Sequence, residues 1–382
     1  MRGHSRSMLL VIAAATFGTA SLHAQERSLE VEIAQLAKDI QTALPASDLA
    51  LTVGKFKASS RLPATAGPAI TLALRRELAK QGIAVRDGAR LRVEGEYRDV
   101  IDQASGGLAV ALIARFVDNK EGKAIDPPIK LKPRGIFGDA SISALLGLSV
   151  EFSPNSSRKE RDEALKLAID KPSAKLHTAN YQPNIPAERL EITTPSSKFR
   201  IEILTKDGGD YVPRSAQLRD GEAFVRIERN EIYAVRLIND YDFEIAVQLS
   251  IDGLSLFAFA DGLNSKTAAA PHGIIVAAKS KGMITGWYRN PKEINEFQVT
   301  EYARSAAAEL NNVAANVGSI TATYCASWPE NGSPPDDEPR MPPRYARSAE
   351  ATARGQIIQE ASEIVDRKFG VVRGSVTVRY SK

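Results

Sequence analysis

The sequence predicts an α+β protein, in which a small N-terminal α/β domain of order α-β-α-β-β is followed by an antiparallel β-sandwich domain. Two observations carry this prediction. Before residue 85, two segments repeat their apolar residues at spacings of three and four, which is the period of an amphipathic helix. From about residue 187 the apolar residues alternate instead, and Gly, Asn and Asp interrupt the runs. That pattern is typical of half-buried strands joined by turns.

The first 24 residues have the three parts of a secretory signal peptide. Arg2 and Arg6 supply the positive charge, Met8 to Ala15 is an uninterrupted apolar run, and Ala24 offers a cleavage point before Gln25. The run is far shorter than the roughly 20 residues that span a membrane as a helix. We therefore expect export to the periplasm or the extracellular space, with cleavage near Ala24 and no transmembrane segment in the mature chain. A retained N-terminal anchor is the alternative.

Charge and cysteine content narrow the classes of function. The formal net charge of +4 falls to +2 once Arg2 and Arg6 leave, because the first 24 residues contain no acid. A chain so close to neutral has no electrostatic attraction for nucleic acid, and we expect no nucleic-acid partner. The single cysteine, Cys325, excludes an internal disulfide. Its place in an apparent strand favours a buried, inert thiol over a nucleophile.

Residues 25–130 are predicted to form the α/β domain. A helix that starts at Leu29 is ended by Pro45, and a second helix has Pro68 in its first turn and Gly82 at its stop. The predicted elements are, in chain order, a helix over 29–44, a strand over 49–56, a helix over 67–82 and strands over 90–100 and 108–118.

Residues 131–186 are predicted to be a helical and extended connector. Prolines occur toward both of its ends, and two helical patterns lie between them, at 139–147 and 157–170. Proline-rich segments favour extended backbone and break helices, so we expect this stretch to link the two domains rather than to belong to either core.

The β-sandwich domain is predicted over 187–328, with a helix inserted at 301–312 before a strand near Val317. Residues 329–348 are rich in proline and charge, and they are predicted to form a disordered loop. Residues 349–382 then supply a helix, over 355–370, and the final strand of the sandwich, which we expect to be ordered up to Tyr380.

Short motifs in the first domain carry a resemblance. A strand ends in "VGKF", a helix with a leucine pair follows, and the next two strands contain "VEGEYRDV" and "VDNKEGKAI". With these motifs, residues 29–126 resemble the small α/β domain of bacterial envelope proteins related to the curli-secretion lipoprotein, the flagellar outer-membrane accessory protein and the N-terminal domain of the Tol translocation protein. The extra helix usual in that group between Val85 and Leu91 is lacking here. The resemblance implies docking or assembly with another envelope protein, and it transfers no catalytic residue.

Four motifs in the second half carry another resemblance. They lie at Tyr233 to Leu254, Ile284 to Trp287, Phe297 to Glu301 and Val317 to Trp328. With these motifs in this order, residues 187–382 resemble an uncharacterised β-rich domain of secreted bacterial proteins. This resemblance implies a fold and an exported setting, and it assigns no activity.

Each residue that could take part in catalysis or metal binding also has a structural interpretation. Asp252 and Gly253 separate two apolar strand patterns, and Asp-Gly there is the strongest short signal for a β-hairpin. The acids of 239–244 alternate, but the segment lacks the glycine and the distal glutamate of a calcium loop, so a weak calcium site is only an alternative. No metal motif is present, and we expect no metal and no cofactor.

The candidate binding residues are Trp287, Tyr288 and Arg289, because aromatic and Arg side chains dominate interface hot spots. Trp287 is expected to anchor the sandwich core, whereas Tyr288 and Arg289 are the better surface candidates. No catalytic residue is assigned. A Ser-His-Asp hydrolase would need His177 or His272 as its base, and neither has a nucleophile-elbow motif beside it.

These observations predict an exported, non-enzymatic envelope protein that acts by binding or assembly with another envelope protein. One alternative is a secreted hydrolase with an inter-domain site that uses His272 or His177. Another is a carbohydrate-binding module, which would require exposed coplanar aromatic side chains.

Overall fold

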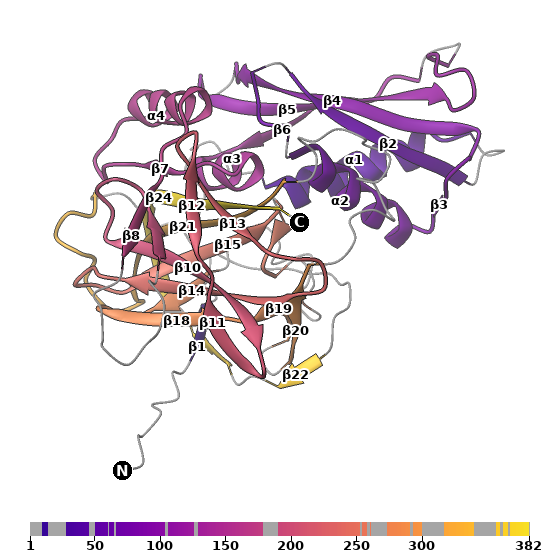
Figure 1. Ribbon diagram of the computed structural model, residues 1–382. Coiled ribbons are helices and arrows are strands. Elements are labelled where there is room, and N and C mark those ends of the chain that lie inside the picture. The colour runs from indigo at the N-terminus through magenta and orange to yellow at the C-terminus, as the bar shows by residue number, and fades with distance from the viewer. Residues whose placement is uncertain are drawn as a thin grey trace.

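The computed structural model describes residues 10–13, 28–45, 50–59, 61–64, 66–103, 106–125, 129–178, 190–252, 254–257, 260, 273–290, 293–299, 317–339, 357–359, 362–365 and 367–381. Over these residues the protein is α+β, as predicted, and an α/β layer packs on a β-rich layer (Figure 1). None of the four described helices combines the length and the apolar character needed to cross a membrane.

The α/β layer contains a five-stranded sheet of order β3-β2-β4-β5-β6. The strands β2, β3 and β4 run parallel to one another, and β4, β5 and β6 pair antiparallel. The predicted order α-β-α-β-β is present, and the short strand β3 and the strand β6 are added to it. The bounds are α1 Leu29–Ala43, β2 Ala50–Ala58, α2 Ala66–Lys80, β3 Ala84–Val85, β4 Leu91–Ile101, β5 Leu108–Asp118 and β6 Arg134–Phe137.

Strand alternation explains why β4 buries one face only. Leu91, Val93 and Tyr97 of β4 are at most 1% exposed, and Val93 and Tyr97 belong to the same core cluster as the apolar sides of α1 and α2. The residues between them are polar, so the opposite face of β4 is charged. The helices therefore cover the inner face of the sheet (Figure 1).

Much of the predicted connector is part of this layer. Strand β6 extends the sheet, and the helices α3, Asp139–Leu146, and α4, Arg158–Asp170, add Ile142, Leu146 and Leu165 to the core of the α/β layer. Ser157 and Glu160 form a capping box that starts α4. Both helices occur where the spacing predicts them, but their apolar sides pack on the sheet instead of remaining in a linker.

The β-rich layer consists of two sheets that share one core. Ile201 and Ile203 of β10 and Val247 and Leu249 of β15 come from different sheets and belong to one buried cluster. The first sheet has the order β12-β13-β24-β21-β15-β17-β1-β23, with β16 beside β15 and β7 beside β24. The second has the order β19-β20-β14-β10-β9-β8, with β11 beside β10, β18 beside β14 and β22 beside β20.

The bounds in the first sheet are β1 Leu10–Ala13, β7 Val150–Glu151, β12 Ala216–Arg219, β13 Glu222–Arg226, β15 Ile245–Ile251, β16 Leu254–Ser255, β17 Ile274–Val276, β21 Val317–Pro329, β23 Ser362–Val365 and β24 Arg367–Ser381. Those in the second are β8 Lys175–Thr178, β9 Leu190–Thr193, β10 Phe199–Asp207, β11 Asp210–Pro213, β14 Ile232–Asn239, β18 Ser280–Ile284, β19 Gly286–Asn290, β20 Glu293–Gln298 and β22 Ile357–Gln359.

The helix predicted over 355–370 is wrong. This stretch instead supplies β22, β23 and the start of β24, which pair with β20, β1 and β21. Isoleucine and valine fit a pleated surface well, and the neighbouring strands decide the outcome against the local helical spacing. The helix predicted over 301–312 lies outside the described residues.

The loop predicted over 329–348 is held in place in its described part. Residues 330–339 form turns, and Asp337 and Glu338 make ion pairs with Arg373 of β24. Residues 340–348 lie outside the described residues. Two carboxylates facing one buried guanidinium fix a segment whose composition alone predicts mobility.

The hairpin predicted at Asp252 is confirmed. Ser250 pairs with Ser255 and Ile251 with Leu254, and Asp252 has a positive φ of 53°. The carboxylate of Asp252 also accepts hydrogen bonds from the backbone N–H of Ser319 and the hydroxyl of Tyr380, each at 2.8 Å. The turn residue therefore ties the hairpin to β21 and β24.

The two layers are joined through backbone. Strand β7 pairs with β24, and the carbonyl oxygen of Leu148 accepts hydrogen bonds from Ser375 at 2.7 Å and from Thr377 at 2.9 Å. Gly374 allows this approach, because a Cβ there would lie 2.6 Å from the carbonyl oxygen of Val150. The layers are thus continuous in hydrogen bonding, with β24 as the shared element.

Candidate functional site

The three predicted binding residues lie on β19 and do not form an exposed surface. Tyr288 is 2% exposed and packs against Phe257, with ring centroids 5.5 Å apart, so its interpretation as a surface residue is wrong. Trp287 is half-buried, meets Phe297 edge-on and contacts both large cores. Arg289 is half-buried. The alternation of β19 turns Tyr288 inward, because its register partner Ile294 also faces the core.

The two histidines of the hydrolase alternative are not brought together by the described residues. His177 lies in β8 opposite Glu191 of β9, and His272 lies outside the described residues. Glu191 is 1% exposed and makes ion pairs with Arg200 and with Lys281. The acid nearest His177 in register therefore already balances two cations.

The thiol of Cys325 is buried, as predicted. The residue is 9% exposed, and its Sγ lies 3.8 Å from the carbonyl oxygen of Ala246. It belongs to a small apolar cluster on the outer side of the first sheet, together with Ile275 and Phe369.

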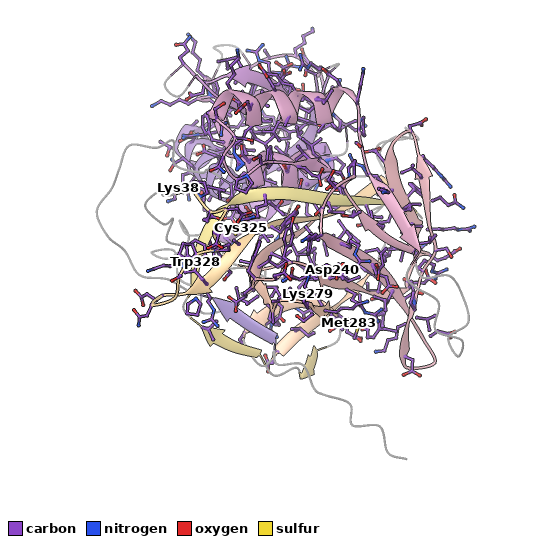
Figure 2. The ribbon with its side chains drawn as sticks, turned by 90° about the vertical axis from the view of Figure 1, so that its left-hand side faces the viewer. Lys38, Asp240, Lys279, Met283, Cys325 and Trp328 are labelled. Carbon is purple, nitrogen blue, oxygen red and sulfur yellow. The ribbon has the colours of Figure 1, made fainter. Side chains whose placement is uncertain are left out.

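The acids of 239–244 serve as ion-pair partners. Asp240 pairs with Arg200, and Asp242 pairs with Lys279 at 2.8 Å. The Lys279 ammonium also donates to the backbone carbonyl of Asp240, and it lowers the pKa of Asp242 below its usual value. Figure 2 labels Asp240 and Lys279 close to each other. Among the described residues, no group of three or more His, Cys, Asp or Glu side chains is placed to hold a metal ion.

The side chain of Asn239 holds the segment 239–244 in place through hydrogen bonds. Its side-chain amide is fully buried and donates to the carbonyl oxygens of Phe243, Val276 and Ala277 at 2.9, 3.1 and 2.9 Å. Its side-chain oxygen accepts from the backbone N–H of Tyr241 at 2.9 Å.

We therefore expect Asn239→Ala to lower the free energy of unfolding by about 1–3 kcal/mol, because it leaves buried carbonyls without a donor. Urea denaturation measures the loss. The matched control is Asn290→Ala, which removes a half-buried amide and should stay within about 0.5 kcal/mol of the unchanged protein. Equal effects of the two substitutions would contradict the role given to Asn239.

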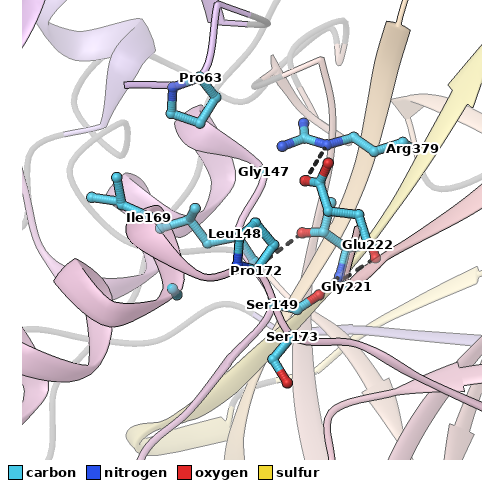
Figure 3. Close-up of a pocket in the computed structure, with 12 residues that line it drawn as sticks. Pro63, Gly147, Leu148, Ser149, Ile169, Pro172, Ser173, Gly221, Glu222 and Arg379 are labelled. Carbon is cyan, nitrogen blue, oxygen red and sulfur yellow. Dashed lines mark hydrogen bonds and ion pairs between the residues drawn. The ribbon is translucent and has the colours of Figure 1, made fainter. Parts of the chain in front are cut away.

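A small recess of about 20 Å3, partly open to solvent, lies between α3, α4 and the hairpin of β12 and β13. Figure 3 shows the Glu222 carboxylate in direct contact with the Arg379 guanidinium, with a dashed line between them. The residues that line the recess are Pro63, Gly147, Leu148, Ser149, Ala168, Ile169, Pro172, Ser173, Gly221, Glu222, Thr377 and Arg379.

The charged side chains of this recess already pair with each other. Arg379 is 4% exposed, donates to the Glu222 carboxylate at 2.8 Å and reaches the carbonyl oxygen of Leu146 at 3.3 Å. Gly221 has a positive φ of 82°, and a Cβ there would lie 2.1 Å from the carbonyl oxygen of Pro172. Because Arg379 is already paired with Glu222, an anionic ligand would have to displace that carboxylate. We therefore interpret the recess as a contact between the two layers and not as a binding site.

The open side of the five-stranded sheet was not predicted from the sequence to be a binding surface. No described helix lies on it (Figure 1). Glu94 stands opposite Arg115 and pairs with it at 2.8 Å. The sequence pattern that could have indicated this surface is the alternation of apolar and charged residues over 90–100. We call it the outer face, and its described residues are Arg92, Glu94, Glu96 and Arg98 of β4 with Ala111, Ile113 and Arg115 of β5.

Comparison of the chain with known proteins gives no match. No family model matches the sequence, and neither a curated protein nor a solved structure matches it.

Proposed function

We propose that this protein is an exported, non-enzymatic envelope protein that acts by binding or assembly with another envelope protein. The observation that carries the proposal is the outer face, where a sheet surface mixes exposed charges with the half-buried apolar side chains of Ala111 and Ile113. The signal-like residues 1–24 and the resemblance of 29–126 to envelope docking domains support the same setting.

The make-up of the outer face suits a protein partner. Arginine is enriched at protein interfaces, and charges of both signs on one surface set the orientation of a partner and suppress wrong ones. Arg115 has 69% of its side chain exposed, and Glu94 lies between it and Arg92, which pairs with Glu94 at 3.1 Å. Arg134 of β6 pairs with Asp39 of α1, so the sheet is fixed to its helices while it presents this surface.

Site-specific photocrosslinking in intact envelopes tests the proposal. A photoreactive residue in place of Arg115 is expected to capture one dominant envelope protein. The matched control is position 226 on β13, because Arg226 is 72% exposed and pairs with Glu228 at the 2.8 Å that separates Arg115 from Glu94. Capture at 115 alone fits the proposal.

A second substitution separates specific capture from chance. Arg98→Glu reverses a charge on the outer face without touching the core, and we expect it to abolish the crosslink at 115 and to leave the melting temperature unchanged. Equal capture at 115 and 226, or a crosslink that survives Arg98→Glu, would reject the outer face as the binding surface.

A further inference from the structure

Strand β1 occupies an internal place in the first sheet. It lies between β17, with which it pairs antiparallel, and β23, with which it pairs parallel. Val11 stands opposite Ile275, and Ile12 stands opposite Ile274. On the other side the register runs from Leu10 opposite Ser362 to Ala13 opposite Val365. Leu10–Ala13 therefore bridges two strands that have no described pairing with each other.

On its β17 side, the place that β1 fills is apolar on both faces of the sheet. Ile274 and Val276 are fully buried in the core of the sandwich. Ile275 points to the other side, where it is 5% exposed and packs with Ala246, Cys325 and Phe369. An occupant must therefore be an extended segment with apolar residues at successive positions, as in a strand buried on both faces.

The same residues form the centre of the predicted signal peptide. Cleavage near Ala24 would remove Leu10–Ala13 from the mature chain. Strand β17 would then have one unpaired edge, and β23 would lose its described partner. Adjacent strands lie about 4.8 Å apart, so the removal opens a slot about 9–10 Å wide, which is the space for one strand. Unpaired N–H and C=O groups at such an edge readily accept another strand.

We propose that the mature protein accepts one apolar strand of a partner protein in the slot between β17 and β23. The occupant is about four residues long and rich in β-branched side chains, and it runs antiparallel to β17 and parallel to β23, as Leu10–Ala13 does. This inference rests on the export given under the proposed function, but it concerns a surface separate from the outer face.

The binding of a synthetic peptide tests the slot. The probe is a labelled peptide with the sequence of residues 8–15, made soluble by terminal lysines, and fluorescence anisotropy follows its binding to the mature chain, residues 25–382. The matched control peptide carries Val11→Pro and Ile12→Pro, because proline keeps the peptide apolar but removes two N–H donors.

We expect saturable binding of the probe, at least about tenfold weaker binding of the proline peptide, and no binding to a chain that keeps residues 1–24. Hydrogen exchange should show that those amides of 274–276 that point to the slot, and not to β15, become protected only when the probe is added. Protection of these slot-facing amides in the mature chain alone would mean that β23 has closed onto β17, and this would overturn the proposal.

Other outcomes separate the slot from the proposed function. Equal binding of both peptides, or binding of neither, overturns the slot, whereas capture at position 115 can still occur. A mass measurement on the exported protein that finds residues 1–24 still attached overturns the slot as well, since β1 then stays in the sheet. Loss of capture at 115 with intact, selective peptide binding overturns only the outer face.

Discussion

Replacing Arg373 with Met is expected to lower the free energy of unfolding by about 3–5 kcal/mol, because it breaks a buried ion cluster from one side. Arg373 is 4% exposed and donates to Asp337 at 2.6 Å and to Glu338 at 2.8 Å. Its guanidinium also lies 4.7 Å from the centre of the Phe243 ring. Methionine keeps much of the volume, but it leaves the carboxylate of Glu338, which is 4% exposed, without its cation.

Denaturation in guanidinium chloride measures this loss. The matched control is Arg226→Met, in which an exposed arginine with one surface partner is removed, and we expect it to change stability by no more than about 1 kcal/mol. Adding Glu338→Gln to Arg373→Met should recover part of the loss, because it neutralises the stranded carboxylate. A single Arg373→Met variant as stable as Arg226→Met would show that the cluster does not hold the 330–339 segment.

The Arg373→Met substitution is also expected to change how stability depends on pH in acid. The hydrogen bond from Arg373 holds the pKa of Asp337 below its usual value. A carboxyl with a lowered folded pKa contributes stability above its unfolded pKa, near 3.9, and that contribution is lost as the pH falls through the folded value. We expect Arg373→Met to lack this portion of the acid-induced loss of stability. An unchanged slope of stability against pH below about 4 would count against the pairing.

Replacing Tyr97 with Ala is expected to cost about 3–5 kcal/mol, the range for large aromatic side chains removed from a core. Tyr97 is fully buried in the middle of β4, within the cluster formed by the sheet, α1 and α2. Its hydroxyl donates to the carbonyl oxygen of Pro63 at 2.5 Å, and burial raises its pKa well above the usual value. The substitution therefore leaves both a cavity and an unpaired carbonyl.

Tyr97→Phe separates these two terms. It keeps the ring and removes only the hydrogen bond to Pro63, so we expect a loss of about 1 kcal/mol. Thermal and urea denaturation of both variants provide the comparison. If Tyr97→Phe proved as damaging as Tyr97→Ala, the hydrogen bond rather than the packed ring would be what stabilises this core.

Features set by neighbouring residues could be predicted from the sequence. The Asp252 turn follows from a two-residue preference for positive φ, and the helix α4 follows from its capping box and its apolar spacing. The burial of Tyr97 follows in the same way from the strict alternation of β4. Each of these depends on contacts a few residues apart, and such contacts are encoded locally.

Features that depend on distant partners could not be predicted in this way. The 355–370 segment carries a helical spacing, yet β20, β1 and β21 pair with its three strands. The candidate binding surface also differs from the predicted one, because Tyr288 follows the register of β20 into the core. Among the described residues, no helix covers the outer face.

By itself, the sequence determined the α+β class, the order of elements in the first domain, the hairpin at Asp252 and the burial of Cys325. Tertiary structure alone decided that the predicted connector joins the α/β core, that Arg373 holds the 330–339 segment, and that β24 unites the two layers. The physical reason is that backbone preferences act within a few residues, whereas strand pairing and ion pairing act between segments that only folding brings together.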